Sequence, residues 1–369
     1  MDNSKNTVEA ETLRTWLENG EPVFVLDVRP SSQREEWKIP GSHYLDAYKR
    51  LNEGDMSVLD EIEIPHNTKV ITVCAAGRTS QIASDALRKK GVHAVSLEGG
   101  MKAWSKAWNV AQRQFPGFEV LQVRRTGKGC LSYIIFSEDE AIIIDASLPT
   151  EVYGQLVNQH KLSVRYVIET HIHADHLSRS KQVADYFKAP LFLPVPNKVQ
   201  FPHNPITEDT SFAVGAINLK SLPTPGHTLE SYTFYIENNV LITGDTLFTN
   251  GVGRPDLKAD PEESRLKSGL LYHSLKRLVS LPDNIQILPA HTNRPVDFDG
   301  KLITTTIREA KKNISLLNSG EKDFINTLLA KIPPTPDNYL SIVEKNLTSN
   351  FTELDSADLE AGANRCAIS

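Results

Sequence analysis

The segment Thr170-His171-Ile172-His173-Ala174-Asp175-His176 places four side chains that can bind a divalent metal within seven residues. It follows a short apolar run at 166–168, which predicts a β-strand. Residues two apart on an extended segment point the same way, so His171 and His173 can converge, and a turn can bring Asp175 and His176 alongside. A polar loop whose histidines only satisfy hydrogen bonds would explain one such cluster, but the pattern recurs three more times.

Each recurrence is an apolar run that ends at one metal-binding side chain. His227 closes the run at 222–226, Asp245 closes 240–244, and His291 closes 285–290. Strand ends of one sheet meet at one rim, where binding sites usually lie. Every candidate ligand is an imidazole or a carboxylate and none is a thiolate, which favours Zn²⁺, Fe²⁺ or Mn²⁺ in a catalytic site over a structural zinc site.

This set of residues resembles the metallo-β-lactamase superfamily over residues 118–300, and its HxHxDH motif is highly specific. The resemblance implies a four-layer αβ/βα sandwich with the metal between two sheets. Two branches of the superfamily fit the motifs: glyoxalase II, a thioester hydrolase with two metals, and persulfide dioxygenase, with one iron.

The ligand count alone does not separate these branches. In a two-metal hydrolase, one ion would take His171, His173, His227 and Asp245, and the other would take Asp175, His176, His291 and the shared Asp245. Two Zn, Fe or Mn ions would then activate a water between them. In persulfide dioxygenases the equivalents of His171, His227 and Asp245 hold one Fe²⁺ as a facial triad, with open positions for persulfide and O₂. His173, Asp175, His176 and His291 would then orient the ligands and bound water.

The segment Gly251-Val252-Gly253-Arg254-Pro255-Asp256 is similar to the Gly-Arg-Pro/Thr-Asp segment of persulfide dioxygenases, rather than to the Gly-Arg-Phe-Phe-Glu usual in glyoxalase II. The resemblance implies that Arg254 is a catalytic candidate and Asp256 a substrate-binding candidate, which together brace the site. A Gly-Pro turn with a surface ion pair is the other interpretation. After His291 the chain departs from the His-Asp-Tyr of the best-known dioxygenases and looks like a bacterial subgroup.

Arg308 and Lys312 lie on a predicted helix that begins near residue 305. They are candidate contacts for a glutathione carboxylate, although a solvated helix face explains them equally well.

A second chemical motif surrounds Cys74, which lies between an apolar run at 69–73 and a predicted helix. Such a loop aims successive backbone N–H groups at one point, and the helix N-terminus adds positive potential that lowers a thiol pKa. The residues that would cradle a thiolate or a bound persulfide anion are Ala75, Ala76, Gly77, Thr79 and Ser80. A buried structural cysteine is the alternative.

The Cys74 loop resembles that of rhodanese, the sulfurtransferase fold. The resemblance covers residues 5–110 and rests also on Asp27-Val28-Arg29, Ile39-Pro40-Gly41-Ser42 and Leu97-Glu98-Gly99-Gly100-Met101-Lys102-Ala103-Trp104. It implies that Cys74 carries sulfane sulfur as Cys–S–SH. Arg78 is fourth after the cysteine, whereas many single-domain rhodaneses have arginine at the fifth place; it remains a catalytic candidate that attracts thiosulfate.

Length and composition indicate how many domains carry these motifs. The chain has 369 residues, 40% of them hydrophobic, which predicts two or three folded domains rather than disorder. We expect an α/β protein with a rhodanese-like parallel-sheet domain at 1–112, a junction at 109–118, a metal-binding αβ/βα sandwich at 113–300, and a helical extension packed on it at 301–369. The net charge of −6 indicates neither a nucleic-acid nor a membrane partner.

The N-terminus lacks a signal-like apolar region and no apolar run is long enough to span a membrane, so the expected location is the cytoplasm. A homo-oligomer stays possible. Three widely spaced cysteines exclude a disulfide framework. Cys130 is expected to be a small core residue, and Cys366 receives no role.

Together the two motifs predict a persulfide dioxygenase with one Fe²⁺ per chain, because both halves would share R–S–SH as an intermediate. The metal domain would oxidise glutathione persulfide, or a similar persulfide, with O₂ to sulfite and thiol. The rhodanese domain would exchange sulfane sulfur with thiosulfate or sulfite, a role in sulfide detoxification, and tethering would raise the local concentration of the intermediate. The alternatives are a two-metal glyoxalase II-like thioester hydrolase with a vestigial rhodanese, and a non-enzymatic sulfur-binding module with a structural metal.

Overall fold

The N-terminal lobe is built on a five-stranded parallel sheet, as the alternation of apolar runs and helices predicts. The computed structural model of the chain describes residues 6–194, 198–257, 259–336, 338–352, 359–360 and 364–368. In sheet order, the strands of this lobe are β1 (Thr7–Val8), β5 (Ala94–Leu97), β4 (Lys69–Val73), β2 (Val23–Asp27) and β3 (His43–Tyr44). The helices are α1 (Ala10–Glu18), α2 (Ser31–Glu36), α3 (Tyr48–Asn52), η1 (Met56–Glu61), α4 (Arg78–Lys89) and α5 (Gly100–Trp104). Apolar clusters on both sides of the sheet bury its central strands.

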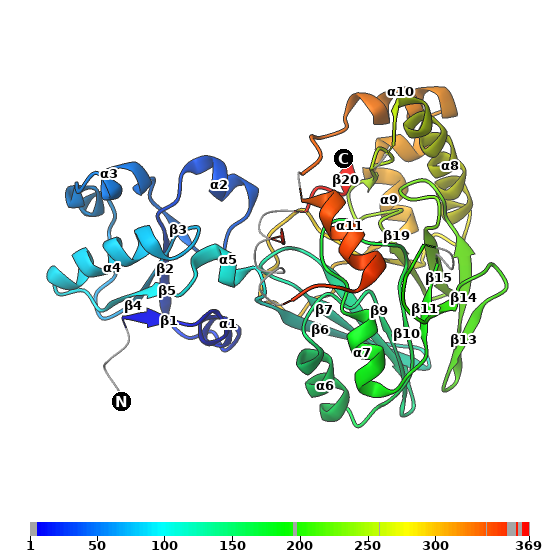
Figure 1. The fold of residues 1–369 in the computed structure, drawn as a ribbon, viewed down its shortest axis with the longest axis horizontal. Helices are drawn as coiled ribbons and strands as arrows, with labels where there is room; N and C mark the ends of the chain where they lie inside the picture. The colour runs from blue at the N-terminus through cyan, green and yellow to red at the C-terminus, as the bar shows by residue number, and fades with distance from the viewer. Residues whose placement is uncertain are drawn as a thin grey trace.

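The larger lobe is a sandwich of two sheets with helices on both outer faces (Figure 1). The seven-stranded sheet runs β12 (Asn204–Pro205), β11 (Leu191–Leu193), β10 (Ser163–Ile168), β9 (Glu140–Ile144), β8 (Leu131–Ser137), β7 (Phe118–Arg124) and β6 (Asn109–Phe115). The six-stranded sheet runs β13 (Ser211–Val214), β14 (Ile217–Pro223), β15 (Tyr232–Ile236), β16 (Val240–Gly244), β18 (Gln286–Pro289) and β19 (Thr305–Thr306). The predicted α/β class and αβ/βα sandwich are confirmed.

Alternation along the strands explains why both sheet faces are covered. On β8, Tyr133 and Ile135 pack into the core between the sheets, whereas Ile134 and Phe136 face the helices α6 (Thr150–Gln159) and α7 (Ser180–Phe187). The other sheet is covered by α8 (Pro261–Val279), α9 (Ile307–Asn313), η2 (Ser315–Asn318) and α10 (Glu321–Ala330). The sequence after residue 301 is thus largely helical and packs on the sandwich, as predicted.

Two parts of the chain differ from the expected outline. The residues expected to form a junction instead form β6 and the start of β7, so the seven-stranded sheet begins before the predicted boundary at residue 113. The tail also returns to the sandwich after α11 (Tyr339–Thr348), where β20 (Ala367–Ile368) pairs with β17 (Val252–Gly253). In Figure 1, α11 lies in front of the sandwich. The domain boundaries themselves stay predictions.

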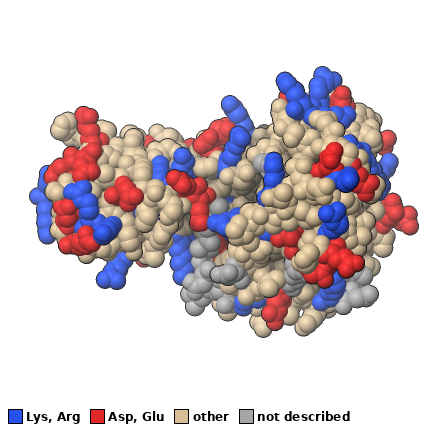
Figure 2. Space-filling model, turned by 90° about the horizontal axis from the view of Figure 1, so that it is seen from above, with Lys and Arg blue, Asp and Glu red and all other residues tan. Residues whose placement is uncertain are grey.

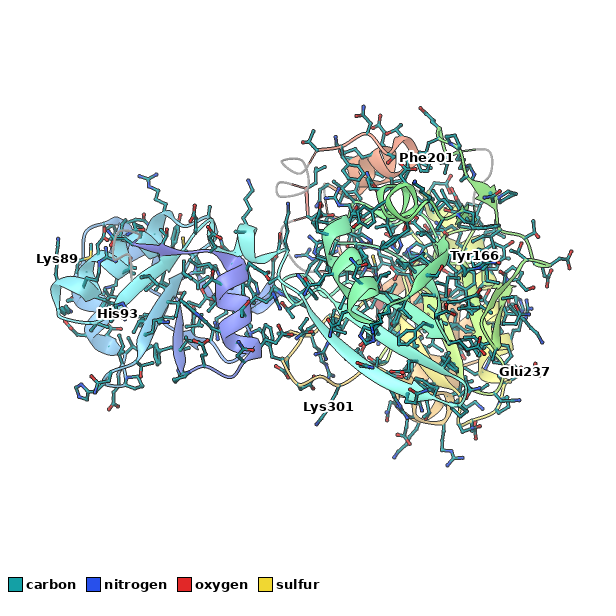
Figure 3. All side chains as sticks on the ribbon, turned by 90° about the horizontal axis from the view of Figure 1, so that it is seen from below. Lys89, His93, Tyr166, Phe201, Glu237 and Lys301 are labelled. Carbon is teal, nitrogen blue, oxygen red and sulfur yellow. The ribbon has the colours of Figure 1, made fainter. Side chains whose placement is uncertain are left out.

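The two lobes meet at the loop between β7 and β8. The Trp37 indole donates a hydrogen bond to the carbonyl of Thr126 at 2.9 Å, and a Cβ on Gly129 would lie 2.9 Å from the Trp37 ring. Arg125 donates to the Ser105 carbonyl at 2.8 Å. Figure 3 shows the extent of the molecule, from Lys89 and His93 in the N-terminal lobe to Tyr166 and Glu237 in the sandwich.

The surface carries charged side chains of both signs, as expected from the small net charge of the sequence. Basic and acidic side chains alternate over both lobes on the face in Figure 2. None of the helices in the described ranges is both long and apolar enough to cross a bilayer.

Candidate metal centre

The seven predicted ligands converge at one end of the sandwich. The HxHxDH residues lie in the loop after β10, His227 follows β14, Asp245 follows β16, and His291 follows β18. These strands belong to both sheets, so residues far apart in the sequence, such as His173 and His291, meet between the sheets with ring centroids 6.0 Å apart. Each of the seven side chains is at most 2% exposed.

Three of them form a compact triad. The ligand atoms of His171, His227 and Asp245 lie within 4.8 Å of one another. Asp245 Oδ2 is 3.7 Å from His171 Nε2 and 3.5 Å from His227 Nε2. All three atoms are buried and lack a hydrogen-bond partner among the described residues. Buried polar atoms normally have a hydrogen-bond partner, so three unpaired atoms that face one another fit the ligand set of a metal ion.

The opposite atoms of the triad are held by the protein. His171 Nδ1 donates to Thr170 Oγ1 at 2.9 Å, and Thr170 in turn donates to Asp145. His227 Nδ1 donates to the Arg254 carbonyl at 2.8 Å. Asp245 Oδ1 accepts from His291 Nδ1 at 2.6 Å. These contacts fix the tautomers, so that each unpartnered nitrogen presents a lone pair.

His173 stands apart from the triad. Its Nε2 lies 3.3 Å from Asp145 Oδ1, and its ring packs between the rings of His171 and His176 at centroid distances of 4.2 Å. The structure therefore places His173 with the other ligands but does not add it to the triad.

A second group of potential ligands includes a thiol, Cys130, which is not among the seven predicted ligands. The potential ligand atoms of Cys130, Asp175, His176 and His291 all lie within 4.8 Å of one another. Cys130 reaches this position because its backbone forms an antiparallel bridge with His291. Cys130 is buried as predicted, but its sulfur lies 3.5 Å from Asp175 Oδ2.

The C-terminal tail also reaches the centre, a contact that no sequence motif predicted. Asn364 Nδ2 donates to Asp175 Oδ2 at 2.6 Å, and Cys366 groups with Asp245 and His291. Asn364 lies 189 residues from its partner, and no local pattern signals such a contact. A buried cysteine in a ligand-rich chain was the only available signal for Cys130 and Cys366.

Arg254 is fully buried, which excludes a surface ion pair. Its guanidinium donates twice to Asp256 at 2.7 and 2.8 Å, and also to the Pro333 and Arg365 carbonyls. Because its own carbonyl accepts from His227, Arg254 connects a triad ligand to the tail. This geometry is that of a bracing residue; the catalytic role of Arg254 and the substrate role of Asp256 stay predictions.

Burial and charge separate the two groups of ligands. Burial, together with nearby His173, lowers the pKa of His171 well below its ordinary value, and burial lowers the pKa of His227. Burial opposes protonation of His176 too, but the Asp175 carboxylate raises its pKa to about 10. The triad imidazoles are therefore neutral and ready to bind a metal, whereas His176 pairs with Asp175.

Burial and the Asp175 carboxylate oppose ionisation of Cys130, but the His176 and His291 imidazoles lower the pKa of its thiol to about 6. The centre therefore favours a thiolate at this position.

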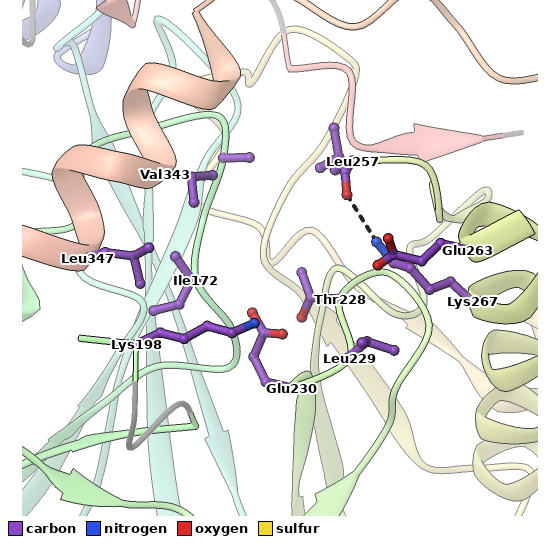
Figure 4. A pocket seen from close by; sticks show the side chains of 11 residues that line it. Ile172, Lys198, Thr228, Leu229, Glu230, Leu257, Glu263, Lys267, Val343 and Leu347 are labelled. Atoms are coloured by element: carbon purple, nitrogen blue, oxygen red, sulfur yellow. Dashed lines mark hydrogen bonds between the residues drawn. The ribbon is translucent and has the colours of Figure 1, made fainter. Parts of the chain in front are cut away.

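A cavity of about 290 Å³ lies beside the ligands. Figure 4 shows its wall, where Ile172 and Thr228 neighbour metal ligands in the sequence and α11 contributes Val343. Two cations, Lys198 and Lys267, line it; Lys267 donates to the Leu257 carbonyl at 3.1 Å.

Arg308 and Lys312 do not line this cavity. They lie on α9, where Arg308 is 4.0 Å from Asp283 and Lys312 is exposed. The structure does not bring them to the ligands.

In the N-terminal lobe, Cys74 follows β4 directly, in the loop that leads to α4, and is 2% exposed. Its sulfur accepts from Gly77 N at 3.1 Å and from Ser80 Oγ at 3.3 Å, while Ser80 also bonds Ser96. Two of the predicted cradle residues thus reach the sulfur.

The other predicted residues of the loop around Cys74 lie as follows. Ala75, Ala76 and Arg78 are exposed, and Thr79 is buried and accepts from Asn52. The anion-attracting role of Arg78 stays a prediction.

Comparison with known proteins agrees with both halves. Residues 125–291 match the metallo-beta-lactamase superfamily, and residues 9–107 match the rhodanese-like domain. The mitochondrial persulfide dioxygenase ETHE1 of Bos taurus is 30% identical over 213 residues, covering 56% of this chain and 78% of that protein. A hydroxyacylglutathione hydrolase of Methylobacillus flagellatus is 28% identical over 170 residues, covering 45% of this chain and 64% of the hydrolase.

Among solved structures, ETHE1 from Myxococcus xanthus superposes with a TM-score of 0.54 at 26% identity, covering 62% of this chain and 98% of that one. The persulfide dioxygenase and the hydroxyacylglutathione hydrolase are thus similar to the chain to nearly the same degree, at 30% and 28% identity. The motifs, the sandwich and these matches lead to one family: the chain belongs to the metallo-β-lactamase superfamily and carries an N-terminal rhodanese-like domain.

Proposed function

We propose that the chain is a persulfide dioxygenase that holds one Fe²⁺ at His171, His227 and Asp245. The reaction is RSSH + O₂ + H₂O → RSH + H₂SO₃, in which the terminal sulfur loses four electrons and O₂ accepts them. Glutathione persulfide or a similar small persulfide is the substrate. The cytoplasmic location expected from the sequence stays a prediction.

The observation that carries this proposal is the three-membered triad. A four-ligand first site of the hydrolase type would need His173, which lies outside the triad. Its Nε2 is 3.3 Å from Asp145 Oδ1, and neither ring nitrogen has a hydrogen-bond partner among the described residues. Two imidazoles and one carboxylate are the facial triad of non-haem iron oxygenases, which leaves positions for a substrate anion and O₂. Bound Fe²⁺ supplies the redox chemistry that O₂ requires.

The remaining residues of the centre orient and shield it. Thr170 and the Arg254 carbonyl hold the triad imidazoles, and His291 holds the triad carboxylate. The cavity wall is partly apolar through Ile172 and Val343, which would exclude bulk water from the reacting sulfur. Lys198 and Lys267 in the same wall are the cations available to a carboxylate of the thiol.

The test compares two activities on one preparation. Iron-loaded protein should consume O₂ when glutathione persulfide is added and should release sulfite in equal amount. Fast hydrolysis of S-lactoylglutathione by a form with two metals, with no O₂ uptake, would contradict the proposal and favour the glyoxalase II alternative. Absence of both activities would favour the non-enzymatic alternative.

The rhodanese-like domain would exchange sulfane sulfur: S₂O₃²⁻ + Cys74–S⁻ → SO₃²⁻ + Cys74–S–S⁻. Gly77 N and Ser80 Oγ donate to the sulfur and would stabilise the anion. Replacement Cys74→Ser should abolish transfer from thiosulfate to cyanide and leave O₂ uptake largely intact. Loss of both activities in a folded variant would argue against two separate sites.

A further inference from the structure

One lysine lies in the buried face of α8. Lys267 is 4% exposed and shares this face with Ser264, Leu271, Ser274 and Leu278. The other buried residues of α8 are uncharged. Positions on the buried face of a helix usually hold apolar or small residues, because a buried charge loses its hydration. The presence of an ammonium group here therefore needs an explanation other than packing.

α8 is held tightly against the segment that carries the triad ligand His227. A Cβ on Gly226 would lie 2.5 Å from Leu271 Cα and 2.7 Å from Leu271 N, so only glycine allows this approach. Lys267 precedes Leu271 by four residues and lies on the same face of the helix, in the wall of the cavity (Figure 4). Burial is the largest cause that lowers the pKa of His227, and the Lys267 charge adds to this lowering. The ammonium is therefore close enough to the triad to act on one of its ligands.

The ammonium of Lys267 has unused hydrogen-bond donors. Of its three N–H groups, one donates to the Leu257 carbonyl at 3.1 Å, the dashed line in Figure 4. Within the part of the chain that the structure describes, Lys267 forms no ion pair. Burial lowers the pKa of this ammonium, and the Glu263 and Glu230 carboxylates oppose that effect from beyond ion-pair distance. A cation this deeply buried is normally paired, so the cavity wall calls for an anion.

We propose that Lys267 binds a carboxylate of the thiol substrate, so that the cavity selects acidic small-molecule persulfides over neutral ones. This inference rests on the proposed function, because it takes the cavity beside the triad as the substrate site. A bound carboxylate would pair the buried cation and accept from its free N–H groups, and such charge-assisted contacts are stronger than neutral hydrogen bonds. The cavity of about 290 Å³ is at the small end of ligand cavities, which suits a thiol of tripeptide size.

The competing explanation is that Lys267 only holds the Leu257 carbonyl in place. In that case its replacement would weaken the binding of acidic and neutral ligands equally. Lys198, the other cation of the wall, is exposed, so water satisfies its ammonium and it does not need an anion. A carboxylate-specific role for Lys267 affects the acidic ligand alone.

The experiment measures, by calorimetry, the binding of S-methylglutathione and of its diethyl ester to full-length, iron-loaded protein. Both ligands carry the same blocked sulfur, but only the first has free carboxylates. Lys267→Met should weaken binding of the acid by about 10–100-fold, the effect expected for a hydrogen bond between charged groups, and leave binding of the ester nearly unchanged. Comparing the two ligands in both proteins cancels the extra bulk of the ester. Lys267→Arg keeps the charge and should keep most of the preference for the acid.

Lys276→Met is the matched control. Lys276 lies on the same helix and also donates to a backbone carbonyl, that of Leu317 at 2.9 Å, but it does not line the cavity. This variant should bind both ligands as wild type does. Lys267→Met keeps the length of the side chain and removes an unpaired buried charge, so it should fold, which thermal unfolding checks.

Three outcomes would overturn the proposal: wild type that binds neither ligand or shows no preference for the acid, Lys267→Met that keeps the preference, or Lys276→Met that loses it as well. Binding, rather than O₂ uptake, is the readout. Equal binding of both ligands would therefore leave the dioxygenase proposal standing, and failure of O₂ uptake would leave the carboxylate site standing.

Discussion

At the scale of single residues, each side chain of the triad directs one polar atom into the triad and the other to a supporting hydrogen-bond partner. Asp245 directs one oxygen to the triad imidazoles and the other to His291. His171 directs Nε2 to the triad and Nδ1 to Thr170. Each of these residues therefore needs a partner on its far side before it can present a ligand atom correctly.

Thr170 provides a test of this dependence. In Thr170→Val the side-chain hydrogen bonds to His171 Nδ1 and to Asp145 Oδ2 are lost, while the shape of the side chain and the backbone bond to Asp145 are kept. We expect iron affinity to fall about 10–100-fold, because such supporting contacts have effects of that size. The measurement is a competition titration with a coloured Fe²⁺ chelator.

Thr246→Val is the control for that change. Thr246 is also buried and follows Asp245 directly, but its hydroxyl bonds Thr224 rather than a ligand. Equal losses of affinity in the two variants would show that the Thr170 contact has no special role.

At the scale of elements, the C-terminal tail closes the centre. β20 pairs with β17, Asn364 bonds Asp175, and Glu360 forms an ion pair with Arg125 at 2.7 Å in which both side chains are 1% exposed. Glu360 also accepts from the backbone N–H of Leu177, next to His176. The described part of the tail is thus fastened to both the ligand loop and the loop between β7 and β8.

The ion pair between Glu360 and Arg125 predicts that the stability of the C-terminal tail depends on pH. Burial opposes ionisation of Glu360, but Arg125 lowers the pKa of its carboxyl from 4.5 to about 2. A depressed folded pKa adds stability above pH 4.5 that disappears as the pH falls toward 2. Wild type should therefore lose tail protection across that window, as amide hydrogen exchange would measure, whereas Glu360→Gln should lack this component.

Glu360→Gln should also lower stability by about 3–5 kcal/mol at neutral pH, because it leaves the Arg125 charge buried and unpaired. Glu36→Gln is the control: Glu36 accepts from Arg365 of the same tail at 2.8 Å, but both side chains are partly exposed. It should cost about 0–1 kcal/mol. A similar cost in both variants would contradict the importance of the buried pair.

At the scale of the whole molecule, the lobes share a contact that lies close to the metal centre. Trp37 of the N-terminal lobe is 3% exposed and packs on Gly129, the residue before Cys130. The turn that positions the thiol therefore also carries the junction between lobes, so their folding should be coupled.

Trp37→Ala tests the coupling. The change removes the contact with Gly129 and the hydrogen bond to Thr126, and we expect a loss of about 3–5 kcal/mol. Calorimetry should then resolve two transitions where wild type shows one. Trp16→Ala, on α1 against Lys69 and away from the junction, should lower the midpoint without separating the lobes; separation in both variants would disprove a specific role for Trp37.

The sequence by itself determined both families and pointed to the seven residues that converge between the sheets. This was possible because each apolar strand and the polar residue after it are adjacent in the sequence. The ends of strands in stacked sheets lie at the same edge of the sandwich, so the residues that follow them come together. Tertiary structure alone decided the rest: it turned His173 toward Asp145, brought the Cys130 thiol opposite His291, and returned Asn364 and Cys366 to the centre. These contacts join residues up to 189 positions apart, and they depend on packing between segments whose local patterns carry no information about each other.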